Sequence, residues 1–152
     1  MDIDFRTVDA RVAPASDLLA AMETEMIELY SDVGMAAMPP ASAADFSPPG
    51  GAYVVGFVDG EPVCGGGLKG LPDGAVEIKR MYVVPSARRR GAARALLGAL
   101  EGTARDLGYS IVRLDTGPRQ PHAKALYAAS GFAEVGNYNG NPYAAYWGEK
   151  RL

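Results

Sequence analysis

The sequence is poor in the residues that hold metals and disulfides: its 152 residues include one cysteine, Cys64, and one histidine, His122. A single cysteine excludes an internal disulfide framework and a cysteine-rich zinc site, and a single histidine excludes a histidine-based metal cluster. No apolar run approaches the roughly 18 residues of a membrane span, and the charged N-terminus lacks the apolar segment of a signal peptide. We therefore expect a cytoplasmic protein that holds no metal and enters no membrane.

Two common phosphate-binding motifs are also absent. A P-loop ends in Gly-Lys-Ser or Gly-Lys-Thr, and no such triplet follows Gly91. A dinucleotide fingerprint needs three glycines in the pattern G-x-G-x-x-G, whereas the loop around Gly91 contains one. Any phosphate site in this chain must therefore be built differently.

Length and composition indicate one globular domain spanning residues 1–152, since 48% of the residues are hydrophobic. The net charge of −3 hides an asymmetry: residues 1–61 carry eleven acids and two arginines, and residues 62–152 carry seven acids and thirteen bases. This division suits a polyanionic ligand on the basic side and a cationic ligand on the acidic side, although scattered surface charge would look the same. A pI near 5.1 argues against a nucleic-acid partner.

Periodicity and turn residues predict an alternating order of strands and helices. A helix begins near Pro14 with Ser16 as its N-cap, and 31–51 is a mobile loop that holds one short helix and is interrupted by Pro39-Pro40. Asp59-Gly60 predicts a type I′ hairpin turn. We expect further helices at 91–107 and 121–130, and strands at 2–8, 52–58, 61–68, 76–84, 110–115, 132–138 and 143–150.

Three features of this order describe how the strands pair. Strands 76–84 and 110–115 are joined through a helix and should be parallel. Strands 132–138 and 143–150 should form an antiparallel pair around residues 139–142. The glycines at 65–67 weaken their strand and indicate the close approach of another backbone or a ligand.

The stretch from Val83 to Leu97 carries the most information. An apolar strand ends at Pro85, a basic loop with Gly91 follows, and a helix begins at once. The first N–H groups of a helix lack internal partners and lie at the positive end of its dipole, so they can bind an anion. Arginines at 88–90 add charge where a pyrophosphate would lie. The alternative is an arginine-rich loop before an ordinary helix.

The pattern R-x-x-G-x-A, formed by Arg88, Gly91 and Ala93, resembles the acyl-CoA signature of the GNAT N-acetyltransferase superfamily. Two more patterns of that family occur in the same order, a strand at 77–85 before the loop and Ala125-Leu126-Tyr127 with Gly131-Phe132 after it. The resemblance implies an α/β (α+β) fold, with a mixed, largely antiparallel sheet of about seven strands flanked by helices and one splayed parallel pair.

The resemblance also implies an activity: direct transfer of an acetyl group from acetyl-CoA to a primary amine of a small molecule, in a ternary complex. A peptide or protein amine is an alternative acceptor, and a non-catalytic acyl-CoA-binding module is an alternative function. No further cofactor is implied, and pairing of two copies through the terminal strands would give a homodimer.

The family's cofactor contacts can be carried over by position. The splayed strand would bind the pantetheine arm, the loop and helix start would bind the pyrophosphate, and Gln120 stands where many relatives have an asparagine, which leaves that contact in doubt. The residues implied in cofactor binding are Met81, Tyr82, Val83, Arg88, Arg89, Arg90, Gly91, Ala92, Ala93, Arg94 and Gln120.

Two residues are implied in the chemistry. Tyr127 matches the family tyrosine near the thiol sulfur and would act as a general acid, or it would merely pack and donate a hydrogen bond. Glu77 matches the general-base glutamate of histone acetyltransferases, or it is a strand-end glutamate paired with a basic neighbour. The acceptor pocket would be formed by the first helix, the 31–50 loop and the last hairpin, with aromatic candidate walls at Tyr30, Tyr138, Tyr143, Tyr146 and Trp147. Cys64 is expected to be a buried, inert side chain.

Overall fold

The computed structural model describes residues 1–33 and 41–152 and contains a seven-stranded sheet in the order β1-β2-β3-β4-β5-β7-β6. Neighbouring strands are antiparallel except β4 and β5, which are parallel. The predicted fold class is therefore confirmed. The strands are β1 (Asp4–Val8), β2 (Ala52–Val58), β3 (Glu61–Gly70), β4 (Val76–Val83), β5 (Ile111–Thr116), β6 (Ala133–Glu134) and β7 (Tyr146–Arg151).

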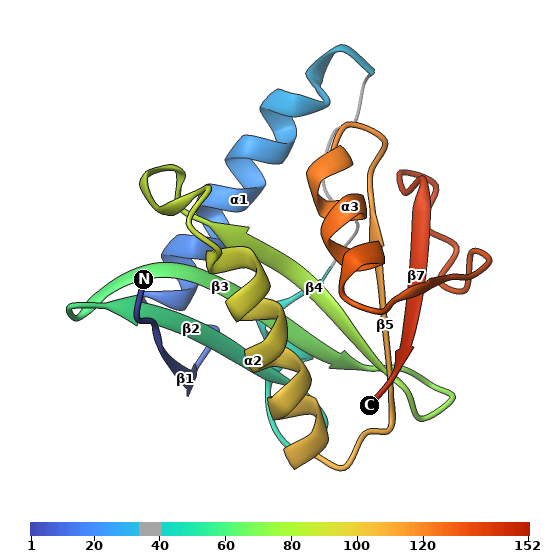
Figure 1. Ribbon diagram of the computed structural model, residues 1–152, viewed down its shortest axis with the longest axis horizontal. Coiled ribbons are helices and arrows are strands. Elements are labelled where there is room, and N and C mark those ends of the chain that lie inside the picture. The colour runs from blue at the N-terminus through green and yellow to red at the C-terminus, as the bar shows by residue number, and fades with distance from the viewer. Residues whose placement is uncertain (34–40) are drawn as a thin grey trace.

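Helices cover both faces of this sheet (Figure 1). Helix α1 (Ala15–Leu29) packs on one face, and α2 (Ala92–Asp106) and α3 (Pro121–Ala129) pack on the other. Short 3₁₀ turns lie at Ser31–Val33, Ala43–Phe46 and Pro85–Ala87. No helix in the described ranges has both the length and the apolar character needed to span a membrane.

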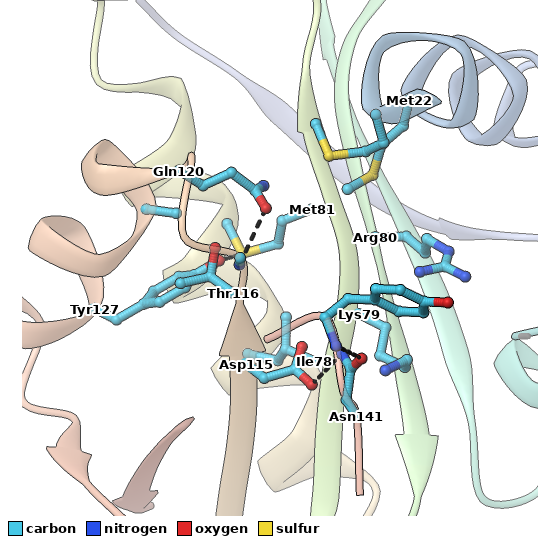
Figure 2. A pocket seen from close by; sticks show the side chains of 14 residues that line it. Met22, Ile78, Lys79, Arg80, Met81, Asp115, Thr116, Gln120, Tyr127 and Asn141 are labelled. Carbon is cyan, nitrogen blue, oxygen red and sulfur yellow. Dashed lines mark hydrogen bonds between the residues drawn. The ribbon is translucent and has the colours of Figure 1, made fainter. Parts of the chain in front are cut away.

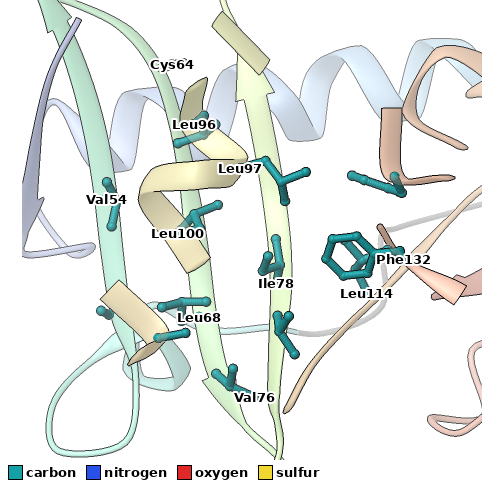
Figure 3. Close-up of a cluster of buried hydrophobic side chains, with 14 of the residues drawn as sticks. Val54, Cys64, Leu68, Val76, Ile78, Leu96, Leu97, Leu100, Leu114 and Phe132 are labelled. Atoms are coloured by element: carbon teal, nitrogen blue, oxygen red, sulfur yellow. The ribbon is translucent and has the colours of Figure 1, made fainter. Parts of the chain in front are cut away.

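Strand alternation divides the buried side chains into two cores. On β2, Val54 points toward α2, while Tyr53 and Val55 point toward α1. Figure 3 shows the α2 side, where Leu96 and Leu100 lie against the sheet, both with no exposed surface. Burying a leucine contributes about 1.5–3 kcal/mol, so the apolar stripe of α2 fixes the helix, and with it the Gly91 turn, on the sheet.

Backbone geometry accounts for the predicted turn at Asp59-Gly60 and for the glycines of β3. Asp59 and Gly60 have φ angles of 50° and 81°, as the type I′ turn requires. A Cβ on Gly67 would lie 2.5 Å from the Phe46 ring, and one on Gly65 would lie 2.7 Å from the Tyr53 hydroxyl. The glycines therefore admit aromatic side chains, rather than the backbone or ligand that the sequence suggested.

The parallel pair separates after two residues. β4 and β5 are in register only at Val76–Val112 and Glu77–Arg113. Arg80 then has a φ of +60°, and the β3–β4 register shifts between Gly65 and Gly67. The strands diverge beyond this point (Figure 1), which leaves the second half of β4 without a partner on its β5 side.

Three predictions need correction or lie outside the described residues. Ser16 lies inside α1, whose N-cap is Pro14 and has no side-chain capping bond. The last two strands are antiparallel, as predicted, but they are shorter than 132–138 and 143–150: β6 has two residues, β7 begins at Tyr146, and residues 135–145 are irregular. Of the predicted 31–51 loop, the Pro39-Pro40 pair is not among the described residues.

Candidate active site

A groove of about 650 Å³ opens where β4 separates from β5. Its walls come from α1, the end of β4, the 87–94 turn and α3. The predicted cofactor residues Met81, Tyr82 and Val83 line it, as does the turn around Gly91, and Tyr127 lies in the same groove. The fold therefore brings together segments that are up to 105 positions apart in the sequence, from Met22 on α1 to Tyr127 on α3.

The backbone of β4 presents an open edge to this groove. The Val84 N–H donates to the Val63 carbonyl of β3 at 2.9 Å. Because successive residues of a strand point their backbone groups to opposite sides, Met81 and Val83 point theirs away from β3, and those of Tyr82 point toward it. An extended ligand with amide groups could therefore pair with Met81 and Val83 as an added strand would.

The Gly91 turn has the geometry of an anion site. Gly91 is the N-cap of α2 with a φ of +82°, and no side chain caps the helix. Arg89 also has a positive φ, of 65°, and alternating backbone of this kind turns successive N–H groups to one side. The N–H groups of the first helical turn are free of intrahelical partners. A Cβ on Gly91 would meet no atom within 4 Å, so the space beside it is open groove.

Arg88 lies at the mouth of the groove with partners of its own. Its guanidinium donates to both carboxylate oxygens of Glu25 on α1 at 2.8 Å, and its Nε donates to the Val83 carbonyl at 2.9 Å. The hydrogen bonds from Arg88 hold the pKa of Glu25 below its usual value. Arg89 and Arg94 line the groove beside it, whereas exposed Arg90 is not among the lining residues.

Tyr127 lies at the inner end of the groove and is 7% exposed. Its ring packs against Phe132 and Tyr146 at centroid distances of 6.0 and 6.5 Å. Its hydroxyl has one hydrogen-bond contact in the described part of the chain, to the Met81 sulfur at 3.9 Å. Burial raises the pKa of Tyr127 well above its usual value. The phenol therefore holds its proton at neutral pH and directs it into the groove.

A second, smaller hollow of about 130 Å³ adjoins the groove (Figure 2). The two share Met81, Gln120 and Tyr127. The far side of the hollow is polar and is formed by Lys79, Arg80, Asp115, Thr116, Asn141 and Tyr143. A molecule in the hollow would thus face a ligand in the groove across the Tyr127 hydroxyl.

Glu77 is buried, at 3% exposure, and lies outside the lining of both hollows. Its Oε2 accepts hydrogen bonds from the Tyr138 hydroxyl at 2.6 Å and from Asn139 Nδ2 at 3.0 Å. Its Oε1 lies 3.2 Å from the Lys79 ammonium. The carboxylate therefore holds the 138–139 segment against β4, and both of its oxygens are engaged.

Of the aromatic residues expected to form the acceptor walls, Tyr143 lines the smaller hollow and the others line neither it nor the groove. Tyr30 is buried, and its hydroxyl donates to Gln120 Oε1 at 3.3 Å. Tyr138 lines a separate hollow beside Arg113, and the Trp147 Nε1 donates to Asn139 Oδ1 at 3.0 Å. These side chains brace the loops around the site. Gln120 itself lies at the junction of the two hollows, where its Oε1 also accepts the Gly117 N–H at 3.1 Å.

Comparison with known proteins identifies the family. Residues 17–132 match the acetyltransferase (GNAT) family over about three quarters of the chain. The chain belongs to the GNAT acetyltransferase family. As a GNAT chain it resembles an uncharacterized N-acetyltransferase of Escherichia coli, YjgM, with 36% identity over 93 residues, which cover 59% of this chain and 56% of that protein.

Other relatives carry more specific names. The IAA acetyltransferase of Azospirillum brasilense is 40% identical over 80 residues, which cover 53% of this chain and 51% of that protein. Human N-acetyltransferase 8 is 40% identical over 83 residues, which cover 55% of this chain and 35% of that protein. The match thus spans about half the length of the bacterial relatives and about a third of the human one.

Solved GNAT structures share the whole fold. The PaiA N-acetyltransferase of Thermoplasma acidophilum, in complex with coenzyme A, superposes with a TM-score of 0.73 at 15% identity and full coverage of both chains. A GNAT acetyltransferase of Elizabethkingia anophelis with acetyl-CoA bound has a TM-score of 0.69 at 18% identity, covering 99% of this chain and 98% of that one. These structural neighbours show that this chain has the GNAT fold.

Sequence reasoning missed one residue of the site, Asp115. Strand 110–115 was recognised by its apolar residues, and its charged positions were not considered. The alternation of buried Val112 and Leu114 with Arg113 and Asp115 places the two charged residues on the opposite face. Because Asp115 also comes near the C-terminal end of a parallel strand, where α/β proteins place binding groups, that pattern could have indicated it.

Proposed function

We propose that this protein is an N-acetyltransferase that uses acetyl-CoA as donor and transfers the acetyl group directly to a primary amine of a small molecule. One observation carries the proposal. The open edge of β4 runs from the Gly91 turn to Tyr127, and there the groove meets a second hollow. Membership of the GNAT family and the coenzyme A found in related folds support it.

The groove fits each part of the donor in turn. The free N–H groups at the start of α2 and the charges of Arg89 and Arg94 suit a pyrophosphate. The backbone groups of Met81 and Val83 suit the amides of a pantetheine arm. Because Arg88 is paired with Glu25, we expect its guanidinium to position the α1 wall unless a phosphate displaces the carboxylate.

The residues at the inner end suit acyl transfer. The thioester supplies an activated acetyl group, and attack by an amine moves negative charge first to its oxygen and then to its sulfur. N–H groups on the open edge of β4 can stabilise charge on the oxygen. Tyr127 can give its proton to the departing sulfur. Burial raises the pKa of Tyr127, so the phenol is protonated in the resting protein; the raised pKa also makes the phenol a weaker acid, so the transfer depends on the negative charge that develops on the sulfur.

The remaining predicted residues have supporting roles in this proposal. Glu77 and Trp147 hold Asn139 in place from opposite sides, and Tyr138 completes the contact with Glu77. Tyr30 fixes Gln120 at the junction of the two hollows. Each acts by positioning a loop, and none needs to touch the reacting atoms.

Two measurements on one preparation test the proposal. Calorimetric titration of coenzyme A should show stoichiometric binding, and a panel of small primary amines should give acetyl-CoA-dependent release of free thiol. Binding without turnover on any amine would support the non-catalytic module instead. Absence of binding would remove the proposal altogether.

A further inference from the structure

Asp115 presents a carboxylate to the smaller hollow (Figure 2). Asn139 Nδ2 donates to its Oδ2 at 2.6 Å, and Asn141 Nδ2 donates to the same oxygen at 3.0 Å. Both hydrogen bonds therefore hold the carboxylate by the same oxygen, Oδ2. No hydrogen bond reaches Oδ1 among those found in the described part of the chain, so that oxygen can accept one from a ligand.

The next residue of β5 carries a buried hydroxyl, on the face opposite Asp115. Thr116, 6% exposed, also lines the hollow, and its hydroxyl has no hydrogen-bond partner within the described structure. Buried hydroxyl groups are nearly always paired, and leaving one unpaired costs about 1–3 kcal/mol. The Thr116 hydroxyl oxygen has almost no accessible surface, so a molecule in the hollow does not reach it, and the case for a ligand depends on Asp115 alone.

The Glu77 carboxylate is less accessible to a ligand than the Asp115 carboxylate. Three donors, on Tyr138, Asn139 and Lys79, occupy its two oxygens. It lines neither the groove nor the smaller hollow. Asp115 lines the hollow that adjoins Tyr127, and its negative charge acts on Tyr127 strongly enough to raise the pKa of that phenol further, after burial.

We infer that Asp115 binds the acceptor in the smaller hollow and takes the proton from its ammonium group, and that this acceptor is a compact amine with no second positive charge. The inference rests on the proposed function. It assigns the base of the reaction to β5 rather than to Glu77 on β4.

The step balances in atoms and charge. An N–H bond of the ammonium breaks and the proton bonds to Asp115. The neutral nitrogen then bonds to the acetyl carbon as the carbon–sulfur bond breaks, and the sulfur takes the proton of Tyr127. A second proton leaves the nitrogen and restores the Tyr127 hydroxyl. The products are an amide, a free thiol and one proton, which Asp115 releases to water.

The size and charge of the hollow set the class of acceptor. Its volume of about 130 Å³ is a fifth of the groove's 650 Å³, so the hollow suits an acceptor that is compact compared with the donor. Lys79 and Arg80 line the same hollow. A second ammonium on the acceptor would lie against these two cations, whereas a neutral or anionic remainder would not.

Several charged groups surround Asp115 and will shape its pH dependence. The groups concerned are Glu77, Lys79 and Arg80 on β4, Tyr127 on α3, Tyr138 in the irregular segment, and Glu23 on α1, which acts through Arg80.

The test compares Asp115→Asn with Asp106→Asn, the same change on the exposed end of α2. Both variants should bind coenzyme A as the native protein does, which shows that they fold and keep the donor site. With n-butylamine at pH 7, Asp115→Asn should lose at least about 100-fold in kcat/KM, the usual contribution of a general base. Asp106→Asn should lose less than about twofold.

Raising the pH provides a second readout that a structural role would not change. The neutral fraction of an alkylamine with a pKa near 10.4 rises about 100-fold between pH 7 and pH 9. The activity of Asp115→Asn should therefore rise nearly in proportion, and that of the native protein much less. Equal pH profiles, or a loss at pH 7 of less than about threefold, would overturn the role of Asp115.

The acceptor class is tested on the native protein, so its outcome does not depend on any variant. We expect n-butylamine to have a kcat/KM at least about tenfold above that of 1,4-diaminobutane; a diamine that is equal or better would overturn the inference about charge. Failure of the proposed function would give a different result from failure of this inference, because the native protein would then bind no coenzyme A or release no thiol with any amine.

Discussion

Removal of one oxygen from Tyr127 separates its chemical role from its structural one. Tyr127→Phe keeps the ring that packs against Phe132 and Tyr146. Within the described residues the hydroxyl that is lost makes one hydrogen bond, to the Met81 sulfur at 3.9 Å, and this contact is weaker than an ordinary hydrogen bond. We therefore expect the free energy of unfolding to change by less than about 1 kcal/mol, and the affinity for coenzyme A to stay within about twofold.

Turnover should respond very differently. A general acid contributes about 10²–10⁴-fold, or about 3–5 kcal/mol of transition-state stabilisation at 1.36 kcal/mol per decade. Because burial raises the pKa of Tyr127, the native phenol stays protonated through pH 9, and its ionisation should produce no decline in kcat below that pH.

Three assays decide this prediction: thiol release for kcat, calorimetry for coenzyme A binding, and urea unfolding for stability. Asp106→Asn serves as the control for handling and expression. A Tyr127→Phe variant that binds coenzyme A normally and turns over within threefold of the native rate would refute the acid role and leave Tyr127 as a packing residue.

The remaining predictions concern the turn, the mouth of the groove and the core. Gly91→Ala should destabilise the fold by about 1–2 kcal/mol, because φ is +82° there, and should raise the Kd for coenzyme A at least tenfold by calorimetry; an unchanged Kd would contradict the anion site. Glu25→Gln should lower that Kd severalfold by releasing Arg88, while urea unfolding shows a loss below about 1 kcal/mol. In the native protein, the contribution of the Arg88–Glu25 pair to the free energy of unfolding should be complete above about pH 4.5 and lost as the pH falls through the lowered pKa of Glu25. A difference in unfolding free energy between native protein and variant that does not change with pH would contradict this. Leu100→Ala, at a site with no exposed surface, should cost about 2–5 kcal/mol in urea unfolding; a loss below 1 kcal/mol would show that the α2 core is not as closely packed as described.

Local signals account for the parts of the fold that the sequence predicted well. The turn at Asp59-Gly60 and the helix start at Gly91 depend on φ angles that few residues adopt, so the residues themselves mark the positions. The bounds of β4 were also located closely, at 76–84 against the observed Val76–Val83. The seven-stranded sheet followed from the order of these elements and from the family resemblance.

The misplaced parts depend on contacts between residues far apart in the chain. Arg88 is paired with Glu25, 63 positions away, and no local pattern marks that partner. The last hairpin was misjudged because Asn139 is held by side chains of β4, β5 and β7, so the segment follows their positions rather than its own β propensity. Glu77 was predicted to be a general base or a strand-end glutamate paired with a basic neighbour, and its contact with Lys79 fits the second alternative. Its partners Tyr138 and Asn139 come from a distant segment that no local pattern marks.

The central claim is that the open edge of β4 and the Gly91 turn together bind an acyl-CoA. Hydrogen–deuterium exchange with and without coenzyme A tests it most directly. The account predicts slower exchange at the amides of Met81 and Val83 and of residues 92–94, with little change along β1. Coenzyme A that leaves those amides unprotected, or protects only a surface remote from Tyr127, would contradict it.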